Sequence, residues 1–139
     1  MNREKRITQT LSWKPREDRA GYELDVSVGF HDPDTGIWEL GRLVAIAVPG
    51  KRARCTLMYG NVPIRRLCDA SRHKNPAPDN TEFKGFHKHR WDETDNQRWA
   101  YLPEDLDTSR YVESPDAAVL DFLKECSIEL VASHQPLLI

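Results

Sequence analysis

Cysteine is scarce in this sequence of 139 residues, and the three cysteines lie far apart. They are Cys55, Cys68 and Cys126, and no Cys-x-x-Cys pair occurs. An odd and scattered set of cysteines does not make a disulfide framework, and it fits a reducing compartment. We therefore expect a cytoplasmic protein whose cysteines serve as small buried apolar side chains.

Long apolar runs are also missing. No stretch approaches the roughly 20 apolar residues that a spanning helix needs, and the first six residues lack the apolar run of a signal peptide. The sequence thus predicts no membrane partner. Apolar residues make up 39% of the chain, which is enough for one core and predicts a single domain over residues 1–139.

Several motifs that identify common enzyme classes do not occur. There is no glycine-rich phosphate loop, no Gly-x-Ser-x-Gly and no His-Glu-x-x-His. Their absence argues against the common nucleotide-binding, hydrolase and metalloprotease classes. Zinc-finger spacing and the aromatic motif of RNA-recognition domains are missing as well.

Charge is distributed unevenly along the chain, although the net charge is only −2. Residues 42–90 hold eleven basic and three acidic residues, whereas residues 91–139 hold three basic and eleven acidic ones. Such segregation indicates a basic surface for a polyanion, or an internal dipole in which the acidic helical region packs against basic strands. The sequence leaves both interpretations open.

Alternation of apolar and polar residues predicts strands in most of the chain. We expect strands over residues 7–13, 22–30, 37–48, 53–58, 62–68, 83–91 and 98–102, with a short extended segment at 128–131. Residues 71–81 have no usable period and are predicted to form an exposed loop. A loop of this length is often functional or mobile.

One helix is predicted near the C-terminal end. Ser114 is a good N-cap, Pro115 suits the first helical position, and Asp116 complements the helix dipole. The apolar stripe of this helix is expected to contain Val119, Leu120, Phe122, Leu123 and Cys126. Together the patterns predict an α+β fold with a mostly antiparallel sheet of about six or seven strands covered by one C-terminal helix.

The segment Gly85–Trp91 has two histidines spaced for one face of a strand. Alternation places His87 and His89 on one face, and Lys88 and Arg90 on the other. As an acid/base pair, one imidazole would take the proton of a 2′-hydroxyl while the other protonates the leaving oxygen. The pair is equally compatible with a zinc site, which needs at least a third ligand, or with a purely structural role.

Other residues would complete either site. His73, at the start of the predicted loop, is the candidate third member, both as support for the acid/base pair and as a zinc ligand with His87 and His89. Asp69 and Cys68 are alternative ligands. The candidate phosphate contacts of a bound nucleic acid are Arg66, Lys74, Lys88 and Arg90.

The second half of the chain resembles a known group of proteins. The motifs are Arg66-Leu67-Cys68-Asp69, His73-Lys74-Asn75-Pro76, His87-Lys88-His89, Trp99–Pro103 and Phe122–Ile128. In their order and spacing they resemble an uncharacterised family of small bacterial proteins found on integrative and phage-like mobile elements. The likeness covers residues 57–130. It implies a toxin, defence or anti-defence role, and it singles out His73, His87 and His89.

Two hypotheses follow from these patterns. The first is a nucleic-acid-directed protein, a toxin-like ribonuclease that works without a metal and uses His87, His89 and His73. The second is a non-catalytic interaction module of a defence or anti-defence system, whose histidines are structural or bind zinc. The expected partner is RNA in the first case and another protein in the second.

Overall fold

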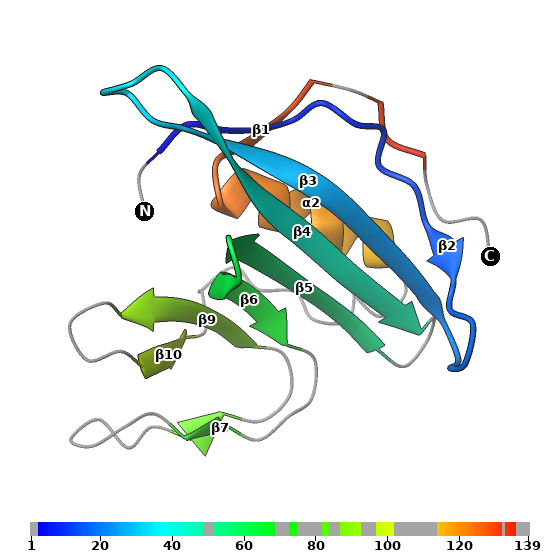
Figure 1. Ribbon diagram of the computed structural model, residues 1–139. Coiled ribbons are helices and arrows are strands. Elements are labelled where there is room, and N and C mark those ends of the chain that lie inside the picture. Colours follow the sequence, from blue (N-terminus) through cyan, green and yellow to red (C-terminus); the bar gives the residue numbers. More distant parts are fainter. Residues whose placement is uncertain are drawn as a thin grey trace.

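A large, mostly antiparallel sheet dominates the structure (Figure 1). The computed structural model describes residues 3–48, 52–68, 73–74, 82–83, 87–92, 97–101, 114–131 and 133–135. Within them the main sheet has nine strands in the order β10-β9-β6-β5-β4-β3-β1-β11, with β2 paired to β3. Every strand pair in it is antiparallel except β1 with β11.

The strands differ greatly in length. The long ones are β3 (Tyr22–His31), β4 (Trp38–Val48), β5 (Arg52–Tyr59), β6 (Val62–Cys68), β9 (His87–Asp92) and β10 (Gln97–Tyr101). The short ones are β1 (Lys5–Ile7), β2 (Lys14–Pro15) and β11 (Ile128–Leu130). The predicted α+β class and mostly antiparallel sheet are confirmed. The strand number exceeds the predicted six or seven because of the short strands.

One face of the sheet is buried under helix α2 (Pro115–Glu125), which Figure 1 shows behind β3 and β4. This core face carries alternate residues of β3, β4, β5 and β6, among them Leu24, Leu43, Leu57 and Leu67, each at most 1% exposed. The open face, on the other side, carries the intervening residues: Leu40, Arg42, Val44, Ile46, Thr56, Met58 and Arg66. The alternation follows from the two-residue period of a strand.

The helix begins where the sequence predicts. Ser114 is the N-cap, and its hydroxyl oxygen accepts a hydrogen bond from the amide of Ala117. Leu120, expected in the buried stripe, is 41% exposed, so that part of the prediction is wrong. Ala117 and Ala118 are buried in its place. Ser127, with a φ of 55°, then lets the chain turn from the helix into β11.

The predicted strand over residues 7–13 is wrong. β1 ends at Ile7, and β2 begins only at Lys14. Between them Leu11 is completely buried and forms an isolated parallel bridge with His134. The side-chain oxygen of Gln9 accepts a hydrogen bond from the amide of Ser27, at an edge position that a continuous strand would occupy.

The region predicted as a loop and a strand is arranged differently. β7 (His73–Lys74) lies within the expected loop of residues 71–81 and pairs with β8 (Glu82–Phe83) in a separate two-stranded sheet. The expected strand over residues 83–91 is therefore not one continuous element of the described chain, because β8 and β9 belong to different sheets. The other loop residues lie outside the described part.

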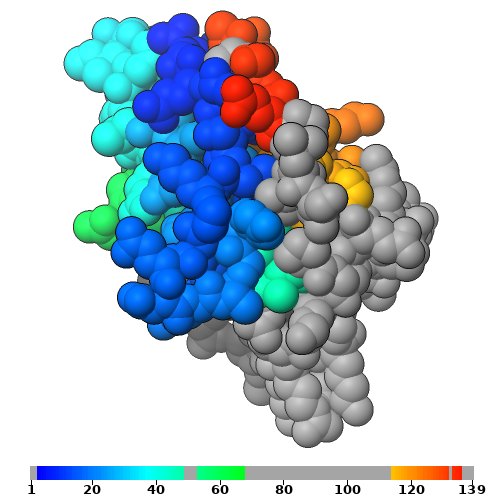
Figure 2. Space-filling view, turned by 90° about the vertical axis from the view of Figure 1, so that its right-hand side faces the viewer, coloured from blue at the N-terminus to red at the C-terminus, as the bar shows by residue number. Residues whose placement is uncertain are grey.

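The two ends of the described chain lie together. β1 and β11 run parallel, with Lys5, Arg6 and Ile7 in register with residues 128–130. In Figure 2 the blue N-terminal segment adjoins the red C-terminal segment. No helix in the described part of the chain has the length and apolar character needed to cross a membrane.

Candidate functional site

A row of residues crosses the open face from β4 to β10. The strand register aligns Val44, Thr56, Arg66, His89 and Ala100, one from each of five neighbouring strands. Residues directly opposite each other in antiparallel strands project from the same face of a sheet. Arg66 and His89, both selected from the sequence, are therefore adjacent in the sheet.

Arg66 has an unusual environment for a cation. The residue is half-buried, and its Nε atom is buried without a hydrogen-bond partner in the described part of the chain. A buried donor that makes no hydrogen bond costs about 1–3 kcal/mol, more if it is charged. Such a donor calls for an explanation, and an acceptor supplied by a ligand is one.

The other predicted residues of β9 have different partners in β6. His87 is in register with Cys68, Lys88 with Leu67, and Arg90 with Arg65. Leu67 is a core-face residue that is only 1% exposed. The position of Lys88 is thus in register with the core face, and that of His89 with the open face. The side chains of β9 themselves lie outside the described residues.

His73 and Lys74 belong to β7, in the small sheet, and the structure does not pair this strand with β9. Their side chains are also outside the described part. The backbone therefore brings Arg66 and His89 together and leaves the place of His73 beside them as a prediction.

Charge on the open face changes from strand to strand. Its acidic residues on β3 are Glu23 and Asp25, whereas β5 and β6 contribute Arg54 and Arg66. Arg42 on β4 donates a hydrogen bond of 3.1 Å from Nε to Asp25. That hydrogen bond is the main reason why the pKa of Arg42 lies above its ordinary value. The basic side of the face therefore begins beyond β4, at Arg54 and Arg66.

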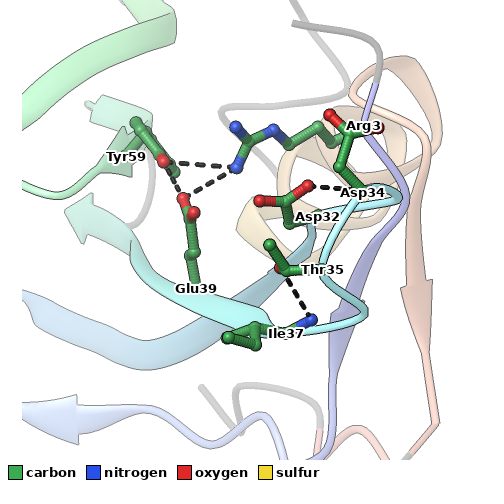
Figure 3. Close-up of polar contacts among 7 residues, drawn as sticks. All are labelled: Arg3, Asp32, Asp34, Thr35, Ile37, Glu39 and Tyr59. Atoms are coloured by element: carbon green, nitrogen blue, oxygen red, sulfur yellow. Dashed lines mark hydrogen bonds and ion pairs between the residues drawn. The ribbon is translucent and has the colours of Figure 1, made fainter.

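A second polar cluster fastens the N-terminal segment to the sheet (Figure 3). Arg3 Nη1 lies 2.7 Å from Oε2 of Glu39 and donates to the hydroxyl of Tyr59 at 3.2 Å. The Tyr59 hydroxyl also donates to Glu39. In the adjoining turn, the amide of Asp34 donates to Asp32 and lowers the pKa of that exposed carboxyl group. These polar groups bind one another within the chain, and their contacts explain the local fold.

A third cluster was not expected from the sequence. His134 Nε2 lies 2.7 Å from Oδ1 of Asp116, which also accepts a hydrogen bond of 2.9 Å from the indole of Trp13. The helix N-terminus is thereby linked to both ends of the chain. No local pattern signals this contact, because its members are far apart in sequence.

The described atoms do not bring the predicted zinc ligands together around one point. Among the residues whose side chains are described, no group of three or more histidine, cysteine, aspartate or glutamate residues is arranged to hold a metal ion. Cys55 and Cys126 are buried in the core, as predicted. The side chain of Cys68 lies outside the described residues.

A comparison with known families identifies one match, to DUF6978, a family of unknown function, over residues 51–128. This segment is more than half of the 139-residue chain. The chain belongs to this family. The DUF6978 segment contains Arg66 and all of β9, whereas β1 to β4 precede it. Searches of curated proteins and of solved structures give no significant match.

Proposed function

We propose that this DUF6978 protein binds RNA on the open face of its sheet and cleaves it without a metal ion. The observation that carries the proposal is the register of Arg66 with His89. The Nε atom of Arg66 is buried and has no hydrogen-bond partner in the described part of the chain. A phosphate group on the open face is a suitable ligand for the guanidinium group of Arg66, since a guanidinium group donates to two phosphate oxygens at once.

The proposed chemistry is an internal transfer at phosphorus. One imidazole, from His87 or His89, takes the proton of the 2′-hydroxyl, and the 2′-oxygen attacks the adjacent phosphorus. The other imidazole donates a proton to the 5′-oxygen as the bond from phosphorus to that oxygen breaks. The products are a 2′,3′-cyclic phosphate and a free 5′-hydroxyl. Arg66 stabilises the charge that grows on the phosphoryl oxygens.

The other predicted residues have supporting roles in this proposal. His73 orients or assists the pair, and Lys74 binds the RNA backbone. Lys88 and Arg90 are in register with core-face positions of β6, so we assign them to phosphates further along the RNA and not to the reacting one. The basic residues of β5 and β6 favour a polyanion in general. A toxin-like role on a mobile element is the biological setting we propose.

The first experiment measures cleavage of a fluorescent dinucleotide and of a single-stranded 12-nucleotide RNA in the presence of EDTA. We expect turnover by the wild-type protein, a loss of at least about 100-fold in kcat for His87→Ala and His89→Ala, and cyclic phosphate ends in the product. Arg66→Ala should lower kcat strongly, and Arg66→Lys should recover only part of it, since lysine cannot donate in bidentate geometry.

Two controls accompany these variants. His134→Ala removes an imidazole that contacts Asp116, and Arg19→Ala removes an exposed cation; both should cleave normally at a temperature where thermal melts show them folded. RNA with a 2′-deoxy residue at the cleaved position should resist cleavage. Loss of activity on addition of EDTA, or equal activity in both β9 histidine variants, would refute the mechanism.

The alternative function is an interaction module whose β9 histidines bind zinc or are structural. Metal analysis of protein purified without a histidine tag tests it directly. Stoichiometric zinc that disappears in His87→Ala, together with no RNA cleavage, would favour the module over the ribonuclease.

A further inference from the structure

A stacked pair of side chains occupies the open face at the other end of the sheet. The guanidinium carbon of Arg6, on β1, lies 3.8 Å from the ring centroid of Trp38, on β4. Gly29 of β3 makes this possible, because a Cβ atom there would lie 3.1 Å from Cε3 of the indole. The imidazole of His31 approaches the same ring at a centroid distance of 4.9 Å. Trp38 and Arg6 are thus held in a defined orientation.

The donors of Arg6 are open to a ligand. In the described part of the chain its guanidinium takes part in no hydrogen bond or ion pair, whereas Arg3 and Arg42 are paired with carboxylates. Stacking therefore orients this cation, and Glu129, in register with it on β11, forms no ion pair with it among the described residues. A preorganised guanidinium group is suited to phosphate and nucleobase recognition.

An exposed apolar side chain adjoins the pair. The register aligns Arg6, Gly29 and Leu40 in one row of the sheet, and Leu40 is 69% exposed. An apolar surface beside a planar cation is the combination that binds an unstacked base and the phosphate attached to it.

The pair and Arg66 lie on the same face. Four strand spacings and about four residues of strand length separate Arg6 from Arg66, which places them roughly 20–25 Å apart. At a stacked rise of 3.4 Å per nucleotide, a single strand of about seven nucleotides covers this distance. The diagonal between them crosses Arg42, Met58 and Thr56 and avoids Glu23.

We propose that Arg6, Trp38 and Leu40 form a distal subsite that holds one nucleotide of a single-stranded RNA whose reacting phosphodiester lies at Arg66. The inference rests on the function proposed above and specifies its substrate as unpaired RNA of about seven nucleotides or more. A duplex is excluded because its base faces are already stacked, and only an unpaired base can lie on the apolar surface.

The test measures binding by fluorescence anisotropy, which does not depend on cleavage. The ligands are a trinucleotide, a single-stranded 12-nucleotide RNA with 2′-deoxy sugars at every cleavable position, and the corresponding 12-base-pair duplex RNA. We expect the 12-mer to bind best, and Arg6→Ala to weaken its binding about tenfold while the trinucleotide is unaffected. Arg6→Lys should behave almost like Arg6→Ala, since lysine cannot stack on Trp38 in the same way.

Matched variants separate the subsite from general charge effects. Arg19→Ala makes the same change in charge at an exposed loop residue and should bind the 12-mer normally. Trp38→Ala should reproduce the effect of Arg6→Ala. If Trp38→Ala proves less stable and melts at a lower temperature, the test relies on Arg6→Ala.

Each outcome decides a different point. Unchanged 12-mer affinity in Arg6→Ala, or an equal loss for the trinucleotide, overturns the subsite alone. Duplex binding as tight as that of the single strand overturns its proposed specificity. Length-dependent binding that Arg6→Ala removes, in a protein that cleaves nothing, supports the subsite and refutes the ribonuclease. Absence of binding to all three ligands refutes both proposals.

Discussion

Lys5 is a charged residue in an apolar setting. It lies on β1 facing the core, is 6% exposed, and donates a hydrogen bond of 3.0 Å from Nζ to the carbonyl oxygen of Arg3. Burial is the main reason why the pKa of Lys5 lies below its ordinary value; nearby Cys126 opposes this effect, and Arg65 adds to it. The folded state therefore releases the Lys5 proton more easily than the unfolded state does.

We predict that Lys5→Met stabilises the protein at neutral pH. The folded-state pKa of Lys5 is lowered, so over the pH range just below 10.5 the unfolded state binds more protons and the wild-type free energy of unfolding rises with pH. In Lys5→Met this rise should be missing. The melting temperature at pH 7 should increase by a few degrees, the shift that about 1 kcal/mol produces. Thermal melts between pH 7 and 10.5 measure both effects.

Lys14→Met is the control. Lys14 is exposed on β2, so its replacement should leave the melting temperature nearly unchanged. A melting temperature at pH 7 that falls in Lys5→Met would show that the hydrogen bond to Arg3 outweighs the cost of burial.

At the scale of elements, β3, β4 and β5 are fitted together at one glycine. Gly41 of β4 lies opposite Val28 of β3 and Tyr59 of β5. A Cβ atom at Gly41 would overlap the carbonyl oxygen of Met58 and the ring of Phe30. Phe30 is fully buried, and its ring packs edge-on against Tyr59 with centroids 5.2 Å apart. The absence of a Cβ atom at Gly41 thus leaves room for the packed rings of Phe30 and Tyr59 at this end of the core.

We predict that Gly41→Ala lowers the free energy of unfolding by about 3 kcal/mol, because the overlap with backbone of the next strand cannot be relieved by a side-chain rotation. Urea unfolding measures the change. Gly29→Ala, in the preceding strand, is the comparison. Its Cβ would lie 3.1 Å from a Trp38 side-chain atom and in ordinary van der Waals contact with Arg6, so the substitution should cost less than about 1 kcal/mol. Equal losses in the two variants would contradict this explanation.

At the scale of the whole molecule, the two ends of the chain stabilise each other. The amide of Val131 donates to the carbonyl of Ile7 at 2.9 Å, and that of Gln135 donates to the carbonyl of Leu11 at 2.8 Å. Leu11 in turn donates to Ser133 at 3.0 Å and is completely buried. Residues more than 120 positions apart in sequence therefore form one cooperative edge of the fold.

We predict that Leu11→Ala lowers the free energy of unfolding by about 2–5 kcal/mol, the usual cost of truncating a buried leucine. Hydrogen exchange should show Val131 and Gln135 losing protection together, while amides in β4 remain protected. Thr10→Ala is the matched control, since Thr10 is exposed and its hydroxyl lies 3.4 Å from that of Ser133. If the amides in β4 lost protection to the same extent as those of Val131 and Gln135, the unfolding would be global and not local.

Much of the secondary structure was predictable because its signals are local. Alternation over residues 22–30 and 62–68 is reproduced by β3 and β6, and Ser114 caps the helix as expected. The strand predicted through Leu11 was wrong because alternation does not reveal which neighbour a strand pairs with. The register of His89 with Arg66 was not predicted, because pairing partners carry no local signal, and the roles of His87, His89 and Arg66 stay predictions.

Side-chain period and capping act within a few residues, so the α+β class, the two-residue alternation of the long strands and the start of the helix follow from local patterns. The fold alone reveals the strand order, the parallel pairing of β1 with β11, the stacking of Arg6 on Trp38 and the burial of Arg66 Nε without a partner among the described residues. These features depend on contacts between residues distant in sequence, for which no local pattern carries a signal.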